Sequence, residues 1–395
     1  MSTGTDAATW ENPPFVYYTF GDYTTVNLNE VKTAPGITLH PSFDNRISIV
    51  EVGPRDGLQN EKTAIPLATK ISLIERLSKT GVSRIEAGSF VSPKWVPQMD
   101  NSSKILAHIL QNEISSPTPI RYCFLAANTH GLLDACSLLT NNPGAFTTQP
   151  ARFLDEMGAT KSAPDGEQRK PALEFAVFTA ATESFSIKNS NCDIKTSLDK
   201  IRDMIPVVKP LKLRVRAYIS VVLGCPFEGY DVNPHRVAEI ATDLMEMGAD
   251  EIALGDTTGM GTIPRTKELL NCMRSAGIRN EDIAMHFHDT YGQALVNTAV
   301  SLEHGIRTFD TSVGGLGGCP YSPGATGNVA TENMVYFLES LGMDTGIDID
   351  AMADIGQWIT KKIGKSNDSS VGKAVLGVRS RQKAERQEAE IQSPV

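Results

Sequence analysis

The segment Ile283-Ala-Met-His-Phe-His-Asp-Thr-Tyr-Gly-Gln293 starts with an apolar run and ends in polar residues, with two histidines two positions apart. We predict a strand over residues 283–288. Side chains on a strand alternate between its faces, so His286 and His288 should point to the same side. Two imidazoles on one face of a rigid strand can chelate a divalent ion. A pair of hydrogen-bonded core histidines is the alternative.

The same pattern of short apolar run, Gly- or Pro-bearing loop and amphipathic helical stretch repeats from Arg46 onward. The predicted strands are 47–52, 84–87, 121–126, 174–178, 213–222, 251–254, 283–288 and 308–313. Helical stretches between them include 67–80, 234–247 and 264–276. Eight strands alternating with helices predict an α/β fold, namely a (β/α)8 TIM barrel. A doubly wound open sheet is the alternative.

The domain organisation follows from where this pattern starts and stops. We predict an N-terminal extension over 1–42, a catalytic barrel over 43–346 and a C-terminal helical region and tail over 347–395. Residues 141–171 are full of Pro, Gly, Thr and charged residues, which predicts a surface insertion. The chain after about residue 378 is dense in Arg, Lys, Glu and Gln and predicts a solvated, short helical or disordered tail.

Composition narrows the classes of function. The 395 residues carry 46 acidic and 37 basic side chains, and this net charge of −9 argues against a nucleic-acid partner. Six scattered cysteines without a Cys-x-x-Cys pair favour reduced thiols. No apolar run is long enough to span a membrane, and the start shows neither a signal peptide nor a presequence pattern. We therefore expect a cytoplasmic protein, with mitochondria left open.

Closure of the predicted barrel would bring distant segments together. The eighth strand would pair with the first, so the loops after strands seven, eight and one share one rim. Asp56 follows strand one, His286 and His288 end strand seven, and a glycine-rich loop from Cys319 to Asn328 follows strand eight. One carboxylate, two imidazoles and one amide oxygen suit Mg²⁺ or Mn²⁺ better than structural zinc. Turn-forming roles for Asp56 and Asn328 are the alternative.

Several motifs resemble one known family. They are Val50-Glu-Val-Gly-Pro-Arg-Asp-Gly-Leu-Gln-Asn-Glu-Lys62, Ser89-Phe-Val-Ser-Pro-Lys-Trp-Val-Pro-Gln-Met99, Leu223-Gly-Cys-Pro-Phe-Glu-Gly229, the two-histidine segment and the Cys319 loop. Together they resemble 3-hydroxy-3-methylglutaryl-CoA lyase, within a wider group of metal-dependent lyases and Claisen synthases. The Cys319 loop is the specific part, because the synthases of that group are not expected to carry it. Departures are Ala87-Gly88, Ala127 and the 141–171 insertion.

The resemblance implies roles for individual residues. Those matching the metal ligands of the family are Asp56, His286, His288 and Asn328. Arg55 matches the substrate-binding arginine and would stabilise an enolate, and Cys319 matches the catalytic cysteine that would protonate it. Gln59 and Glu86 are expected to contact the substrate or to orient ligands. His286 or a metal-linked water is the expected base, with Asp256 as a possible assistant or a helix cap.

The implied reaction cleaves 3-hydroxy-3-methylglutaryl-CoA, or a close 3-hydroxyacyl-CoA, to acetyl-CoA and acetoacetate with Mg²⁺ or Mn²⁺. The expected partners are the acyl-CoA substrate and a second copy in a homodimer. We expect no nucleic-acid or membrane partner. Two alternatives remain: a condensing enzyme of the same superfamily that uses acetyl-CoA, and a barrel that binds an acyl-CoA without turnover.

Overall fold

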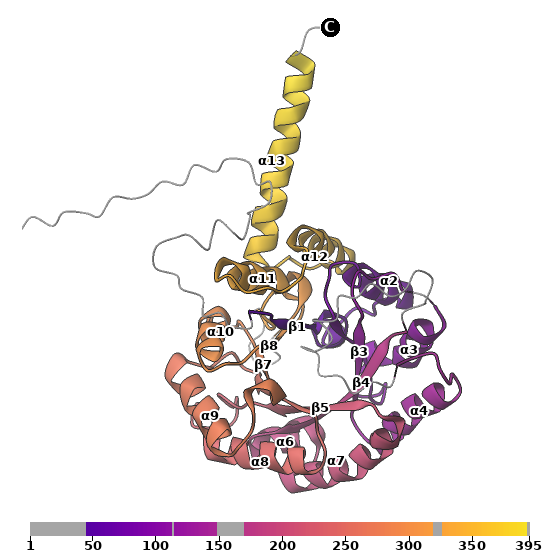
Figure 1. Ribbon diagram of the computed structural model, residues 1–395, viewed down its shortest axis with the longest axis vertical. Helices are drawn as coiled ribbons and strands as arrows, with labels where there is room; N and C mark the ends of the chain where they lie inside the picture. The colour runs from indigo at the N-terminus through magenta and orange to yellow at the C-terminus, as the bar shows by residue number, and fades with distance from the viewer. Residues whose placement is uncertain (1–44, 113, 148–169, 319–325, 393–395) are drawn as a thin grey trace, which may run out of the picture. The chain divides into compact units, whose positions relative to one another are not determined.

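The computed structural model describes residues 45–112, 114–147, 170–318 and 326–392. Its eight parallel strands form one closed barrel in the order β1-β2-β3-β4-β5-β6-β7-β8 (Figure 1). The strands are β1 (Ser48–Glu51), β2 (Arg84–Phe90), β3 (Arg121–Ala126), β4 (Ala172–Ala180), β5 (Arg214–Ser220), β6 (Glu251–Asp256), β7 (Ile283–Phe287) and β8 (Thr308–Thr311). The predicted TIM barrel is confirmed, and the open sheet is excluded because β1 pairs with β8 along its whole length.

Helices cover the outside of this barrel. They are α2 (Leu67–Leu77), α3 (Ser102–Gln111), α4 (Thr129–Thr140), α6 (Glu183–Ser190), α7 (Ile194–Val208), α8 (Pro234–Glu246), α9 (Ile263–Ser275), α10 (Ala294–Glu303) and α11 (Thr331–Ser340). The apolar faces of the helices pack on the outer face of the sheet in one large core. Because both faces of a strand are covered, every residue of β1, β2 and β3 is buried. Among the described residues, no helix is both long and apolar enough to cross a membrane.

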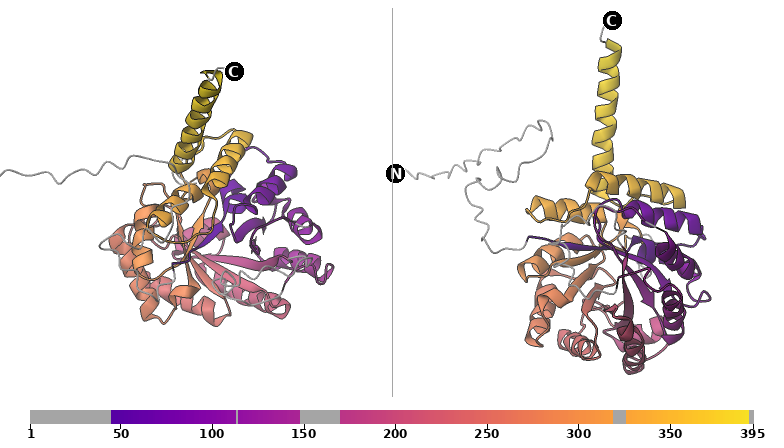
Figure 2. Two further views of the ribbon diagram at one scale, coloured as in Figure 1. Left: turned by 45° about the horizontal axis from the view of Figure 1, so that its top comes forward. Right: turned by 45° about the vertical axis from the view of Figure 1, so that its right-hand side comes forward.

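Two helices follow the barrel at its C-terminal side. Helix α12 (Ile349–Ile363) starts at Asp348, whose side chain accepts a hydrogen bond of 3.0 Å from the backbone N–H of Ala351. Helix α13 (Ser370–Gln392) packs its first turns on α11 and α12 and then extends away from the barrel (Figures 1 and 2). The segment predicted as a helical region and tail thus contains two helices, and the part after residue 378 is helical as far as Gln392.

Some predicted boundaries are wrong. Strand β2 does not end at Ala87 but continues to Phe90, with an irregularity in its pairing between Glu86 and Gly88. Strands β1 and β8 are shorter than predicted, because the chain turns away at both carboxyl ends to form the rim loops. The predicted N-terminal extension and most of the predicted insertion lie outside the described residues.

The inside of the barrel is charged near the amino ends of its strands. Arg84 donates hydrogen bonds of 2.8 Å to both Glu174 and Glu251, and all three side chains are buried. Arg216 lies above them, with its Nε 3.3 Å from Glu251 and its Nη2 2.5 Å from Asp310. Buried charges require such pairing, because an unpaired charge in this environment is costly. The network therefore fills the barrel beneath the carboxyl-end rim.

Candidate active site and metal centre

The predicted metal ligands meet at the carboxyl-end rim of the barrel. Asp56 lies in the helical turn Gly53–Gly57 directly after β1, and His286 lies within β7. His288 follows β7 and forms an isolated bridge with Asn328, which returns from the loop after β8. Because β7, β8 and β1 are neighbours in the closed barrel, segments from both ends of the sequence converge here.

The distances within this cluster are short. One potential ligand atom each from Asp56, His286 and His288 lies within 4.8 Å of the other two. The two imidazole centroids are 5.3 Å apart, as expected for side chains on one face of a strand. The amide Nδ2 of Asn328 donates to Oδ2 of Asp56 at 2.8 Å. The structure thus places together all four residues that the sequence singled out.

The donors of this cluster fit a divalent cation. His288 is buried, and its Nδ1 has no hydrogen-bond partner among the residues that the structure describes. Buried polar atoms normally have a partner, so an orphaned ring nitrogen on a residue of this cluster indicates that a further group completes the site. Carboxylate and amide oxygens combined with imidazole nitrogens suit Mg²⁺ or Mn²⁺, which keep open positions for substrate or water.

The electrostatics of Asp56 and His288 favour metal binding at neutral pH, whereas for His286 the lowering effect of burial is outweighed by Asp310 and Asp56, which raise its pKa. Burial alone would raise the pKa of Asp56, but the charges of Arg55, His286 and His288 outweigh it and hold that pKa below its ordinary value. Burial and the charge of His286 lower the pKa of His288 to about 4. Asp56 is therefore a carboxylate and His288 a neutral imidazole, the forms in which both ligate metal ions.

Arg55 lies between two carboxylates beside the cluster. Its Nη1 donates to Oδ1 of Asp56 at 2.6 Å, and its Nε donates to Oε2 of Glu86 at 2.7 Å. The guanidinium carbon lies 5.5 Å from the ring centroid of Tyr218, whose hydroxyl donates to the same Glu86 oxygen at 3.3 Å. Glu86 is fully buried, so it orients Arg55 rather than facing an open space.

A cavity of about 680 Å³ opens beside these residues. Its wall includes Arg55, Asp56, Gln59, His286 and His288. From there it extends over the ends of β2–β5 to α6 and α7, where its lining includes Lys188, Asn191 and Lys200. Glu86 is not part of the lining, whereas Gln59 is. The volume suits a small molecule with an extended arm better than a single small acid.

The departures from the family pattern fall on two sides of the barrel wall. Ala87 packs in the outer core, and a side chain at Gly88 would meet Oγ of Ser102 on α3 at 2.8 Å. These two positions therefore face away from the cavity. Ala126 and Ala127 do line the cavity. Cys319 lies outside the described residues, while the residue before it, Gly318, belongs to the cavity wall.

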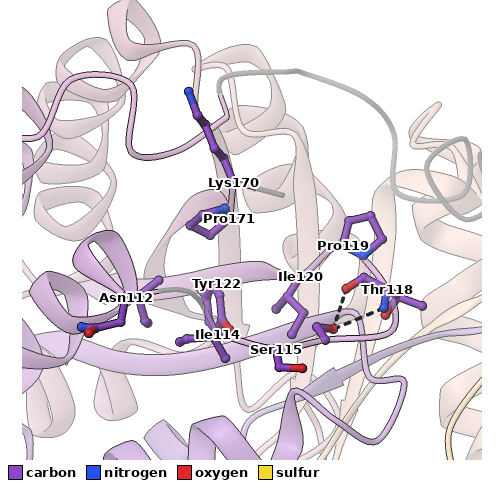
Figure 3. Close-up of a pocket in the computed structure, with 11 residues that line it drawn as sticks. Asn112, Ile114, Ser115, Thr118, Pro119, Ile120, Tyr122, Lys170 and Pro171 are labelled. Carbon is purple, nitrogen blue, oxygen red and sulfur yellow. Dashed lines mark hydrogen bonds between the residues drawn. The ribbon is translucent and has the colours of Figure 1, made fainter. Parts of the chain in front are cut away.

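A second cavity, of about 490 Å³, lies elsewhere in the fold (Figure 3). It is bordered by the end of α3, the amino end of β3 and Lys170. None of the described residues that line it is a carboxylate, a histidine or a cysteine. Of these two cavities, only the rim cavity is therefore lined by described side chains that could ligate a metal ion.

Comparison with known proteins agrees with this geometry. The HMGL-like family model matches residues 46–152 and 157–359, which include all four residues of the cluster. The chain belongs to the HMGL-like family.

Similar proteins in this family are lyases by name. The chain is 45% identical to 3-hydroxy-3-isohexenylglutaryl-CoA/hydroxy-methylglutaryl-CoA lyase of Pseudomonas aeruginosa, over 85% of this chain and 99% of that protein. It is 41% identical to hydroxymethylglutaryl-CoA lyase of Pseudomonas mevalonii, over 83% of this chain and 96% of that protein.

Solved structures of the family share the fold. The crystal structure of hydroxymethylglutaryl-CoA lyase from Pseudomonas aeruginosa superposes with a TM-score of 0.72 at 44% identity, covering 85% of this chain and 98% of that one. An HMG-CoA lyase from Acinetobacter baumannii, solved in complex with coenzyme A and 3-methylmalate, has a TM-score of 0.70 at 31% identity and covers 85% and 97%.

Three buried residues of the site were not identified from the sequence. They are Asp310 in β8, and Arg216 and Tyr218 in β5. Asp310 contacts His286, Arg216 contacts Asp310, and Tyr218 lines the cavity between Arg55 and Arg216. For Asp310 and Arg216, the signal in the sequence is a charged side chain within a strand of the predicted barrel, which is costly to bury without a partner.

Proposed function

We propose that this protein is a divalent-metal-dependent lyase that cleaves 3-hydroxy-3-methylglutaryl-CoA, or a close 3-hydroxyacyl-CoA, to acetyl-CoA and acetoacetate. The observation that carries the proposal is the cluster of Asp56, His286, His288 and Asn328 beside Arg55. Asp56 and the two histidines line a cavity of about 680 Å³. The lyase names of the similar proteins and the coenzyme A in one similar structure support it.

The proposed roles of the cluster residues follow from their donors. The ion, Mg²⁺ or Mn²⁺, would be held by Asp56, His286, His288 and Asn328. When bound, it would act as a Lewis acid that orients the substrate hydroxyl and lowers its pKa. His286 is engaged through Nδ1 with Asp310 at 3.1 Å, and its Nε2 faces Asp56. With a hydrogen on Nδ1 and the ion on Nε2, His286 would have no free lone pair to accept a proton, so we assign it to the ion rather than to general-base catalysis.

Asp256 is then the candidate proton acceptor. Burial raises its pKa to about 7, close to the pH at which a general base works best. Its Oδ2 accepts a hydrogen bond of 3.0 Å from the N–H of Gly261, while its Oδ1 has no partner. The first contact supports the alternative of a structural cap for the loop after β6, and so does the position of Asp256, which is buried and is not part of the cavity lining. The absence of a partner for Oδ1 among the described residues supports the catalytic role.

Arg55 and Cys319 would act after the carbon–carbon bond breaks. The permanently charged guanidinium of Arg55 would stabilise the enolate of acetyl-CoA, because its charge is held in place by Glu86 and Asp56. Cys319 would then donate a proton to the enolate carbon. Gln59 would contact the substrate from the cavity wall.

A substrate panel tests the proposal. The purified protein is assayed with 3-hydroxyacyl-CoA thioesters in Mg²⁺, Mn²⁺ or EDTA, and acetoacetate is measured. We expect release that depends on the metal and is fastest with 3-hydroxy-3-methylglutaryl-CoA. Metal-dependent condensation of acetyl-CoA with a 2-oxo acid would identify the synthase alternative. Substrate binding without any product would identify the non-catalytic barrel.

The assembly and the cellular location are further parts of the proposal. We propose a homodimer that works in the cytoplasm. Cytoplasmic and mitochondrial relatives are similarly close by identity, at 40% for the mouse cytoplasmic and 39% for the chicken mitochondrial enzyme. Light scattering of the purified protein and microscopy of a tagged protein test the two statements separately.

A further inference from the structure

Asp310 is the only described acidic residue in β8, and both of its carboxylate oxygens are engaged. Oδ2 lies 3.1 Å from Nδ1 of His286, on the neighbouring strand β7. Oδ1 accepts a hydrogen bond of 2.5 Å from Nη2 of Arg216, across the barrel on β5. The side chain is 2% exposed, so water does not compete for either contact.

Arg216 is held in place from below and from the side. Its Nε lies 3.3 Å from Glu251, which in turn is bound by Arg84. Its guanidinium carbon lies 4.9 Å from the ring centroid of Tyr218. A guanidinium has donors and no acceptor, and it stays protonated in proteins. Arg216 therefore always presents an N–H to Oδ1 of Asp310.

This fixed donor determines what the other end of the carboxylate does. Oδ2 of Asp310 is then left to accept a hydrogen bond from His286. The donor of this hydrogen bond is Nδ1 of His286, which therefore carries the ring hydrogen. The neutral ring then has its lone pair on Nε2, the nitrogen that faces Asp56 at 4.0 Å.

We propose that Arg216 and Asp310 form a positioning pair that fixes the tautomer and ring orientation of His286, so that Nε2 is the metal-binding nitrogen. The inference rests on the proposed metal-dependent function and adds two residues that touch neither the ion nor the substrate. Partners of this kind orient a ligating histidine, and their loss usually weakens metal affinity about 10- to 100-fold.

The decisive variant is Asp310→Asn, because an amide has one acceptor and one donor end. Its oxygen must face Arg216, since two donors would otherwise meet. Its NH₂ group then faces Nδ1 of His286 and requires a lone pair there, which places the ring hydrogen on Nε2. We expect Mn²⁺ affinity, measured by electron paramagnetic resonance on the metal-free protein, to fall about 10- to 100-fold.

A double variant distinguishes positioning from mere packing. In Arg216→Met/Asp310→Asn the guanidinium is gone, so the amide can rotate and offer its oxygen to His286. We expect Mn²⁺ affinity to return to within a few-fold of wild type. A packing role predicts the opposite, because the second substitution would add its own loss. A double variant that binds Mn²⁺ no better than Asp310→Asn overturns the proposal.

Asp282 and Arg279 provide the matched control. They form a second Arg–Asp pair with contacts of 2.6 and 2.7 Å, next to the amino end of β7 and away from the histidines. Asp282→Asn and Arg279→Met/Asp282→Asn should leave Mn²⁺ affinity unchanged. Thermal unfolding of all metal-free variants shows which of them are folded.

A measurement on the wild-type protein does not depend on variants that fold. Nitrogen NMR of ¹⁵N-histidine in the Mg²⁺-loaded protein should place the hydrogen of His286 on Nδ1, with the signal assigned by its loss in His286→Gln. A hydrogen on Nε2 overturns the proposal. Failure of the proposed lyase function would instead appear as absent acetoacetate release, with the Mn²⁺ pattern and the NMR result intact.

Discussion

The side-chain amide of Asn328 donates a hydrogen bond of 2.8 Å to Oδ2 of Asp56, although 272 positions separate the two residues in the chain. The same nitrogen lies 3.2 Å from the carbonyl oxygen of Leu316 and donates to it as well. The amide thus links the loop after β8 to the turn after β1. Asp56 and Asn328 are the two oxygen ligands of the proposed metal site, so the contact that links these two rim segments also holds the two ligands together.

Asn328→Asp tests this contact. Burial raises the pKa of Asp56, but Arg55 and the two histidines outweigh burial and keep it below its ordinary value, so Asp56 is negatively charged. A second carboxylate at position 328 would repel this charge. The substitution also removes the N–H that donates to Oδ2 of Asp56. We expect the metal-free variant to unfold at a lower temperature than wild type at pH 8. Saturating Mn²⁺ should recover most of the difference, because a cation between two carboxylates removes the repulsion. A variant whose loss of stability is unaffected by Mn²⁺ would argue against shared ligation.

Arg55→Lys separates binding from chemistry. Lysine keeps the charge but loses the planar fork that contacts Glu86 and Asp56. Since the enolate exists only after bond cleavage, kcat should fall by about 10²–10³ with a much smaller change in KM. Steady-state kinetics of acetoacetate release provide the measurement. A change confined to KM would reduce Arg55 to an anchor for the substrate.

Cys319→Ala tests the proton donor. We expect this variant to keep its fold and its Mn²⁺ affinity but to lose most acetoacetate release, because no thiol is left to protonate the enolate. Alkylation of the wild-type thiol should inactivate the enzyme, and bound substrate should slow that inactivation. Cys272→Ala, which removes a buried thiol on α9, is the control and should leave turnover unchanged. Near-full activity in Cys319→Ala would place the donor elsewhere.

Glu332→Gln tests the pH dependence of stability. Burial raises the pKa of Glu332 from 4.5 to about 8. Its carboxylate accepts a hydrogen bond from the N–H of Gly314, which opposes this rise only in part. An acid whose pKa is raised by folding stabilises the protein fully below pH 4.5, and this contribution is lost as the pH rises to about 8. At pH 8.5 the glutamine variant should therefore be more stable than wild type, by on the order of 1–2 kcal/mol.

At pH 5 the wild-type protein and Glu332→Gln should unfold at nearly the same temperature, because protonated glutamic acid and glutamine are similar in shape. Scanning calorimetry from pH 5 to pH 8.5 provides the comparison. Glu388→Gln, at an exposed position of α13, is the control, and its unfolding temperature should equal that of wild type at both pH 5 and pH 8.5. A wild-type protein whose stability does not fall more steeply than that of Glu332→Gln would contradict the assignment.

The sequence predicts the parts of the fold and site that depend on local patterns. The two histidines share a face because a strand has a period of two, and Asp56 joins them because a parallel eight-stranded barrel has to close. The continuation of β2 to Phe90 was missed, because Gly88 and Ser89 look like the start of a loop. Their conformation follows from packing against Ser102 on α3, which no local pattern reveals.

The residues that hold His286 in place, Asp310 and Arg216, are harder to predict from the sequence. Asp310 contacts His286, 24 positions away, and Arg216, 94 positions away, and neither spacing is that of a turn or of a helix face. Such partners are set by the barrel register, which places Asp310 beside His286 on adjacent strands. A charged residue in an apolar strand indicates that a partner exists, but only the structure identifies it.

Mn²⁺ binding by His288→Ala tests the central claim most directly. His288 is buried, its Nδ1 is unpaired, and it faces Asp56 and His286 within 4.8 Å. His130→Ala, at an exposed position on α4, is the matched control. Electron paramagnetic resonance titration and acetoacetate release are measured on the same samples. The account predicts wild-type behaviour for His130→Ala, and for His288→Ala a folded protein that has lost both tight Mn²⁺ binding and turnover. A folded His288→Ala that binds Mn²⁺ and releases acetoacetate as wild type does would contradict the account.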